Sequence, residues 1–356
     1  MSSIDYIKDF LKGKADAALI ISEENVRYFT SFSSTNGYLL ITENTSIFLT
    51  DSRYIEAAQN QIKSCDEVCE IKSVEQTLAP LVENLGIKSI CVEQSRMTLS
   101  QLSVFKKHFK NVAFVTDSSL DSKINRLRSV KNKQEAEKIE KAQRIAERAF
   151  DHILEFITIG KTEREISLEL DYTMLKAGAD ALSFETIAVS GSNGSMPHGV
   201  PGSKKIESGD FITMDFGAVF DGYHSDMTRT VAVGDISIKQ AEVYNTVLQA
   251  QKAGLEAIKP GTECRAVDKK ARDIIAAKGY GDYFGHGFGH GVGIEIHEYP
   301  NLSPKSEAIL KIGNVVTAEP GIYIPGEFGV RIEDMVLVTD DGYYNFTKCN
   351  KELIVL

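Results

Sequence analysis

Short apolar runs alternate with helical spacing in the first third of the sequence. Five runs predict strands, at residues 17–21, 38–42, 47–50, 90–92 and 112–115. Two segments between them have the apolar spacing of helices, at residues 55–62 and 99–109. This alternation predicts an α/β domain of about 120 residues, an ordinary size for one domain.

The pattern changes between residues 122 and 133, where the sequence becomes polar and highly charged. We therefore predict two domains, residues 1–124 and 125–356. A long helix is predicted to begin at Glu135 and to end before Gly160. Its apolar residues recur every three or four positions and form one stripe: Ile139, Ala142, Ala146, Ala149 and Ile153.

A second helix is predicted to follow the first. Thr162 and Glu165 have the spacing of a capping box, and Gly178 marks the end of this helix. The remaining segments are a β-rich stretch at 184–233, helices at 238–257 and 262–278, and a β-rich stretch at 289–356. Helices and strands in separate blocks predict an α+β fold for this domain.

The two β-rich stretches resemble each other. Residues 209–217 (GDFITMDFG) align without gaps on residues 313–321 (GNVVTAEPG), with three identical positions. Asp215 aligns with Glu319, and each is followed by a turn and a second strand with another carboxylate. We interpret this repeat as an internal duplication whose two halves deliver ligands to one central site.

The first repeat contains a hairpin signal. Asp221-Gly222 is typical of a two-residue type I′ turn, which would place Asp215 opposite Thr228, with Asp226 on the same face. In the second repeat, Glu319 and Glu333 are expected on strands, with Arg331 on the face of Glu333. Carboxylates that converge among apolar neighbours repel one another unless cations hold them, so we predict bound metal ions.

Histidines gather near the second repeat. Three of the seven in the chain fall in one glycine-rich segment, and a fourth candidate precedes the first repeat: His286, His290, His297 and His198. Glycines let the backbone approach a ligand closely, but their spacing here does not fit a phosphate-binding or dinucleotide-binding loop. The cluster therefore favours a metal or substrate site over a nucleotide site.

Composition narrows the function classes further. The chain is 42% hydrophobic and 25% charged, as in globular proteins, and its net charge of -10 argues against nucleic-acid and anionic-membrane partners. No stretch approaches the roughly 20 apolar residues of a membrane span, and the first residues lack the apolar core of a signal peptide. The five scattered cysteines are expected to be reduced. We therefore expect a cytoplasmic protein.

The sequence resembles the pita-bread metallopeptidases, the family of methionine aminopeptidase, proline dipeptidase and aminopeptidase P. Two motifs are similar to the creatinase-type N-terminal domain of the proline-specific branch, residues 25–30 (NVRYFT) and 50–54 (TDSRY). Seven motifs are similar to the catalytic domain: PHG at 197–199, MDFG at 214–217, SDMTRT at 225–230, GHGFGH at 285–290, HE at 297–298, EPGIY at 319–323 and VRIED at 330–334. The resemblance implies a pita-bread catalytic domain with pseudo-twofold duplicated β halves.

The resemblance also implies a ligand set for two divalent metal ions. Asp226 and Glu333 would bridge the ions, Asp215 would complete one site, and His290 with Glu319 would complete the other. Oxygen-rich ligation with one histidine suits Mn²⁺, Co²⁺ or Fe²⁺, with Zn²⁺ also compatible. We expect Mn²⁺.

Further roles follow from the same resemblance. Glu319 would also be the general base, His198 and His297 would contact the substrate, and His286 would lie beside a proline pocket. Arg331 and Tyr323 would hold Asp215 in place.

The expected activity is hydrolysis of the Xaa-Pro bond at the N-terminus of short peptides, as in aminopeptidase P. An Xaa-Pro dipeptidase is the alternative activity, and a metal-free peptide-binding module is a third hypothesis. The resemblance implies a homodimer.

Overall fold

The computed structural model describes residues 2–356, and the chain divides into two units, Met1–Arg128 and Ser129–Leu356. From the sequence, the division was expected between residues 124 and 125, in the polar and highly charged segment at 122–133. Residues 122–129 of that segment lie in a helix that was not predicted, α6 (Ser119–Ser129). Leu120 and Ile124 are fully buried in the core of the first unit, and their four-residue spacing was the missed signal.

A six-stranded mixed sheet with the order β4-β3-β2-β1-β5-β6 forms the centre of the first unit. Its strands are β1 (Ala17–Ile20), β2 (Gly37–Thr42), β3 (Ser46–Thr50), β4 (Glu67–Glu70), β5 (Ser89–Val92) and β6 (Ala113–Val115). Besides α6, the helices of the first unit are α1 (Ser3–Leu11), α2 (Glu23–Thr30), α3 (Ile55–Gln61), the π-helix η1 (Val74–Leu78), α4 (Ala79–Asn84) and α5 (Leu99–His108).

Helices cover both faces of this sheet. In β1, Ala18 and Ile20 pack in one cluster with buried residues of α1, α2, α3 and α6. Ala17 and Leu19 pack in a second cluster with buried residues of α4 and α5. Alternate residues of a strand point to opposite faces, so the continuous apolar run of β1 fits a strand buried on both sides.

The five strands predicted for this unit are all present, but β4 was not predicted. This strand lies at the edge of the sheet and pairs only with β3 among the described strands. Its sequence, EVCE, is exposed at both glutamates and half-buried between them, so no apolar run marks it.

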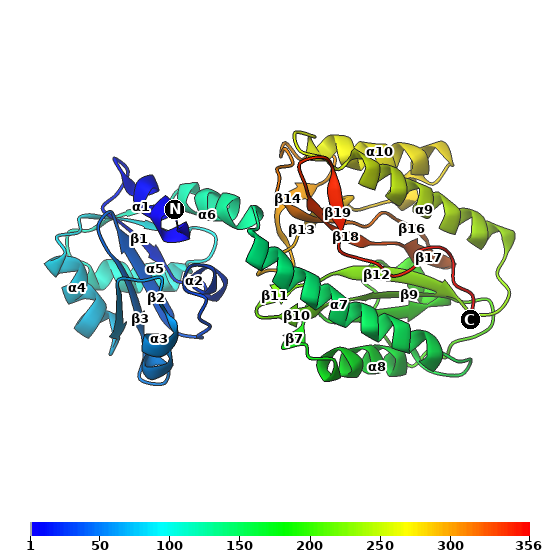
Figure 1. Cartoon of the computed structure of the whole chain (residues 1–356), viewed down its shortest axis with the longest axis horizontal. Coiled ribbons are helices and arrows are strands. Elements are labelled where there is room, and N and C mark those ends of the chain that lie inside the picture. The colour runs from blue at the N-terminus through cyan, green and yellow to red at the C-terminus, as the bar shows by residue number, and fades with distance from the viewer. Residues whose placement is uncertain (1) are drawn as a thin grey trace. The chain divides into compact units, whose positions relative to one another are not determined.

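The second unit contains two pairs of helices, with its strands between them (Figure 1). The first pair is α7 (Lys133–Phe156) and α8 (Glu163–Lys176), and the second is α9 (Ile238–Ala257) and α10 (Cys264–Ala277). The predicted capping box of α8 is confirmed, because Thr162 Oγ1 accepts from the Glu165 N–H and the Glu165 carboxylate accepts from the Thr162 N–H. The members of each pair pack against each other.

Four sheets lie between the helix pairs, with orders β12-β9-β8, β11-β10-β7, β14-β13-β15-β18-β19 and β16-β17. In the first half the strands are β7 (Ala181–Leu182), β8 (Ile187–Ser190), β9 (Phe211–Phe216), β10 (Ala218–Phe220), β11 (Tyr223–His224) and β12 (Met227–Ala232), with a short 3₁₀ helix η2 (Gly191–Ser195). In the second half they are β13 (Gly289–Gly291), β14 (Glu298–Leu302), β15 (Val315–Ala318), β16 (Gly321–Ile324), β17 (Phe328–Arg331), β18 (Asp334–Val338) and β19 (Tyr343–Asn345), after the 3₁₀ helix η3 (Gly281–Tyr283).

The predicted duplication is visible in the order of these elements. In each half two packed helices precede a three-strand arrangement in which the repeated segment is central: β9 lies between β8 and β12, and β15 lies between β13 and β18. Each half has its own apolar core, one under α7 and α8 and one under α9 and α10. The two repeated carboxylates, Asp215 and Glu319, therefore come from equivalent places in the two halves.

Among residues 2–356, no helix combines the length and the apolar character needed to span a membrane.

Candidate metal centre

The first two carboxylates are positioned by the hairpin that the sequence predicts. Asp221 and Gly222 both have positive φ, 46° and 72°, as a type I′ turn requires. The register set by this turn continues into the β9–β12 pair and places Thr228 opposite Asp215. Asp226 lies immediately before β12 and is 4% exposed.

The second two carboxylates occupy breaks between strands, which corrects the expectation that Glu319 and Glu333 lie on strands. Glu319 lies between β15 and β16, and Glu333 lies between β17 and β18. The pairs Ala318–Asp334 and Gly321–Arg331 have the same register, so Glu319 and Glu333 stand opposite each other where the hairpin changes sheets. The Glu319 N–H donates to Phe288 O, and the Glu333 N–H donates to Thr228 O.

Thr228 joins the two halves of the site. Its hydroxyl donates to Glu333 Oε2 at 2.8 Å and accepts from Arg331 Nε at 3.1 Å. Its carbonyl accepts from Glu333 N at 3.1 Å. Thr228 of β12 therefore fixes both the backbone and the side chain of Glu333, which belongs to the second half.

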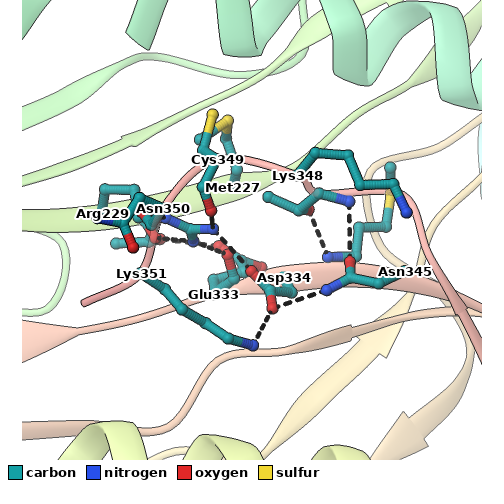
Figure 2. Close-up of polar contacts among 12 residues, drawn as sticks. Met227, Arg229, Glu333, Asp334, Asn345, Lys348, Cys349, Asn350 and Lys351 are labelled. Atoms are coloured by element: carbon teal, nitrogen blue, oxygen red, sulfur yellow. Dashed lines mark hydrogen bonds and ion pairs between the residues drawn. The ribbon is translucent and has the colours of Figure 1, made fainter. Parts of the chain in front are cut away.

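Glu333 is also held from behind, through its backbone and its neighbour (Figure 2). The buried Arg229 guanidinium donates to the Glu333 carbonyl and forms an ion pair of 2.8 Å with Asp334. Asp334 also binds Lys351 at 2.6 Å and Asn345 at 3.0 Å. This network ties the backbone of Glu333 to the C-terminal segment.

His290 approaches the carboxylates from β13. Its Nε2 lies 3.2 Å from Glu319 Oε1 and 3.5 Å from Asp226 Oδ2, and its Nδ1 lies 3.1 Å from Gly291 O. A proton on Nδ1 bonded to that carbonyl leaves Nε2 as a free ligand atom. Gly289 permits the close approach of β13 to Thr317, because a Cβ at residue 289 would lie 2.1 Å from Thr317 O.

Ligand atoms of Asp226, His290 and Glu333 all lie within 4.8 Å of one another. Two buried oxygens, Asp215 Oδ1 and Glu333 Oε1, have no hydrogen-bond donor among residues 2–356. Buried carboxylate oxygens need such partners, and hard divalent cations bind them well. The donor set therefore fits metal ions, as the sequence predicts.

The electrostatics of the cluster support the same conclusion. Burial and the neighbouring carboxylates raise the pKa values of Asp226 and Glu333 well above the usual range. Burial works to lower the pKa of His290, but Glu319 and Asp226 outweigh it and raise that pKa to about 9. Burial opposes the effect of His290 on Glu319, yet the imidazole lowers the pKa of Glu319 to about 2. The negative charge at this point is in excess, and bound cations would neutralise it.

Arg331 and Tyr323 form a second group around Asp215. Arg331 Nη2 lies 2.6 Å from Asp215 Oδ2, and its Nη1 donates to the Tyr323 hydroxyl at 2.8 Å. His286 Nε2 lies 2.9 Å from the same hydroxyl, and burial lowers the pKa of His286. Arg331 therefore contacts Asp215 directly, whereas Tyr323 reaches it only through Arg331, and His286 joins the same chain of hydrogen bonds.

All the predicted site residues line one pocket of about 560 Å³: His198, Asp215, Asp226, His286, His290, His297, Glu319, Tyr323, Arg331 and Glu333. His198 and His297 are exposed within it, and the His297 ring centroid lies 4.3 Å from that of His290. His224 does not line the pocket, and its backbone N–H donates to Gly293 O instead.

Thr317 is a site residue that was not predicted from the sequence. Its hydroxyl donates to Glu319 Oε1 at 3.0 Å and accepts from His290 N. Thr317 lies two residues before Glu319, so strand alternation could have indicated it.

Comparisons with known proteins identify the family of the chain. The sequence pattern of metallopeptidase family M24 matches residues 137–340, and that of the creatinase/prolidase N-terminal domain matches residues 8–130. An Xaa-Pro dipeptidase of Pyrococcus furiosus is 40% identical to this chain over 356 residues, which cover 98% of each protein. The predicted fold, a creatinase-like domain followed by a pita-bread domain, is confirmed.

Two solved structures are similar over nearly the whole chain. An Xaa-Pro dipeptidase from Bacillus anthracis has a TM-score of 0.95 and 43% identity and covers 99% of each chain. An X-Pro aminopeptidase from Thermotoga maritima has a TM-score of 0.91 and 38% identity, and the match covers 98% of this chain and 100% of that one.

Proposed function

The chain belongs to metallopeptidase family M24, and from this premise we propose that it is an Xaa-Pro dipeptidase that uses two divalent metal ions. The observation that carries the proposal is the buried cluster of four carboxylates and one histidine at one pocket with three further histidines. From the sequence, aminopeptidase P activity was the first expectation. The full-length similarity to dipeptidases from two organisms favours the alternative, so we reverse that order.

The five ligands are assigned from the donor set and the resemblance together. Asp226 and Glu333 would bridge the two ions, Asp215 would bind one, and His290 with Glu319 would bind the other. Bound divalent ions supply positive charge that polarises a peptide carbonyl and lowers the pKa of a water molecule. We propose Mn²⁺ as the physiological ion, with Co²⁺, Fe²⁺ and Zn²⁺ as alternatives to be compared.

The remaining residues orient the substrate and move protons. Glu319 Oε1 is fixed by Thr317 and His290, which suits the carboxylate to act as the general base. His297, beside His290, would donate a hydrogen bond to the oxygen of the attacked carbonyl, and His198 lines the same pocket. A bond before proline has no N–H, so recognition of the proline must come from packing of its ring. Apolar lining residues suit that packing: Phe184, Ile187, Val200, Pro201 and Ile296.

A specific feature of the pocket favours aminopeptidase P activity as the second candidate. Of the described lining residues, Arg331 is the only one with a permanent positive charge, and it already binds Asp215, Tyr323 and Thr228. A dipeptide would bring a free carboxylate after its proline, whereas a longer peptide would bring a neutral amide. The similar X-Pro aminopeptidase of Thermotoga maritima supports keeping this candidate.

The test compares substrates of different length. The purified chain, loaded with Mn²⁺, Co²⁺, Fe²⁺ or Zn²⁺, would be incubated with Ala-Pro, Ala-Pro-Ala and the control Ala-Ala. Release of alanine from Ala-Pro alone supports a dipeptidase, and release from Ala-Pro-Ala supports an aminopeptidase. Asp226→Asn should abolish either activity. If neither proline substrate is cleaved with any of the four ions, both activities are rejected, and a peptide-binding module becomes the leading hypothesis.

The homodimer and the cytoplasmic location stay predictions. Sedimentation equilibrium of the purified chain tests the first of them directly.

A further inference from the structure

A buried carboxylate outside the metal cluster organises the loop that bears His198. Glu163 begins α8 and is 0% exposed. Its Oε1 accepts from Ser190 N at 2.7 Å, Ser190 Oγ at 3.1 Å and Asn193 Nδ2 at 3.1 Å. Its Oε2 accepts from Gly202 N at 3.0 Å and from the same Asn193 amide at 3.2 Å. One side chain therefore binds both ends of the segment from Ser190 to Gly202.

The middle of this segment lines the pocket. Residues 197–201 are all lining residues, and His198 is among them. The His198 side chain is exposed and makes no hydrogen bond to any residue in the range 2–356. Its place in the pocket therefore depends on the backbone that carries it. Arg331 Nη1 donates to Pro197 O at 3.2 Å, which ties the same backbone to the group around Asp215.

We propose that Glu163 is a positioning residue for His198: it fixes the ends of the 190–202 loop and so sets the imidazole in the pocket. This inference rests on the proposed function, in which His198 contacts the peptide. In all five hydrogen bonds of the Glu163 side chain the carboxylate is the acceptor, and hydrogen bonds to a charged acceptor are stronger than those between neutral groups. Glutamine at this position would turn an NH₂ group toward donors that need an acceptor.

The variant Glu163→Gln tests this role through a double-mutant cycle with His198→Ala. Displacement of a substrate-contacting group by about 1 Å can lower a rate by roughly 100-fold, so we expect E163Q to lower kcat/KM by about 10- to 100-fold. In the His198→Ala background the same substitution should lower kcat/KM less than about twofold, because the group through which Glu163 acts is gone. Equal effects in the two backgrounds would overturn the proposal.

A matched control lies two residues along the same helix. Glu165→Gln keeps the capping box, since glutamine serves in that position, and Glu165 does not line the pocket. We expect its kcat/KM to equal that of the wild type. A loss in E165Q as large as in E163Q would assign the effect to the stability of α8 and overturn the proposal.

A second measurement needs neither metal nor substrate. In metal-free protein labelled with ¹³C-histidine, the ring signal assigned to His198 by its loss in His198→Ala should shift or broaden in E163Q. The signals of His108 and His152, which do not line the pocket, should not change. An unchanged His198 signal would contradict the proposed role. If E163Q does not fold, Asn193→Ala removes two of the five hydrogen bonds and should also shift the His198 signal, and an unchanged signal in that variant would contradict the proposed role.

The two proposals fail separately in these experiments. A wild-type chain that cleaves no proline peptide rejects the proposed function, whereas the shift of the His198 signal reports on the loop alone. An active wild type with an additive cycle and an unmoved His198 signal rejects the role of Glu163.

Discussion

The Thr228 hydroxyl donates a 2.8 Å hydrogen bond to Glu333 Oε2, so a residue of the first half of the catalytic unit orients a carboxylate of the second. The same hydroxyl accepts from Arg331 Nε, and Arg331 binds Asp215. The two halves are therefore coupled at the point where the metal ions are proposed to bind. Residues that orient metal ligands affect affinity without touching the metal.

We expect Thr228→Val to weaken metal binding by about 10- to 100-fold, a typical loss when a residue that orients a ligand is removed. Valine keeps the shape of threonine but neither donates to Glu333 nor accepts from Arg331. Thr228→Ser keeps the hydroxyl and serves as the control. Competition of each variant with a chelator for Mn²⁺ measures the affinity, and equal affinities for the valine and serine variants would contradict the role of the hydroxyl.

The position of Thr228 opposite Asp215 could be predicted from sequence, because a two-residue turn at Asp221-Gly222 fixes the register of the whole hairpin. The repeat between residues 209–217 and 313–321 likewise predicted two equivalent carboxylates. The hairpin register is set by a local turn, and the carboxylates recur in a repeated segment, so both can be recognised in the sequence alone.

Other features depend on contacts between distant segments and left no such pattern. Glu319 and Glu333 leave their strands because the long hairpin passes from one sheet to another, which only the pairing partners reveal. Glu163 is at the start of a helix, where an acidic residue is ordinary, and its burial follows from the return of the 190–202 loop. Strand β4 lacks an apolar run because both of its glutamates are exposed and the two residues between them are only half-buried.

In the metal-free protein, Asp226 should lower the free energy of unfolding. Asp226 is buried beside Asp215 and Glu319, and burial with this repulsion raises its pKa well above the usual range. We therefore expect Asp226→Asn to stabilise the metal-free protein by about 1–3 kcal/mol at neutral pH, the scale of a buried polar mismatch, while it abolishes metal binding. Urea unfolding in EDTA measures the first effect. A metal-free variant less stable than the metal-free wild type would show that other contacts of Asp226 outweigh the repulsion.

The buried ion pair between Lys131 and Glu298 should matter more than exposed pairs of the same type. The nitrogen and oxygen lie 2.9 Å apart, and the side chains are 1% and 4% exposed. Lys131→Met removes this partner from a buried carboxylate next to His297, and we expect a loss of about 3–5 kcal/mol in the free energy of unfolding. Lys131→Met with Glu298→Gln should recover part of it.

Lys269 and Asp273 provide the control for that prediction. Their side chains are 71% and 60% exposed at a distance of 2.7 Å. Lys269→Met should change the free energy of unfolding by less than about 1 kcal/mol. Urea unfolding of the three variants compares them, and similar losses in K131M and K269M would show that burial does not decide the outcome.

The network behind Glu333 predicts unequal effects for the two cations that share Asp334 (Figure 2). Arg229 is 1% exposed, while the Lys351 side chain is 22% exposed. Arg229 also donates to the carbonyls of Glu333, Cys349 and Asn350, so its loss leaves one buried and two part-buried acceptors without this donor. We expect Arg229→Met to cost about 3–5 kcal/mol and Lys351→Met about 1 kcal/mol in the free energy of unfolding. Urea unfolding measures both, and equal losses would contradict the greater role of the buried cation.

The same network predicts a pH dependence. Burial acts to raise the pKa of Asp334, but Arg229 and Lys351 outweigh burial and lower this pKa below its ordinary value of 3.8. A carboxyl group with a lowered pKa in the folded state stabilises the protein above its unfolded pKa and loses that contribution as the pH falls through the folded value. The difference in stability between wild type and Arg229→Met should therefore be constant from pH 7 to about pH 5 and should shrink below about pH 4. Urea titrations across that range measure it, and a difference that grows on acidification would reverse the assigned sign.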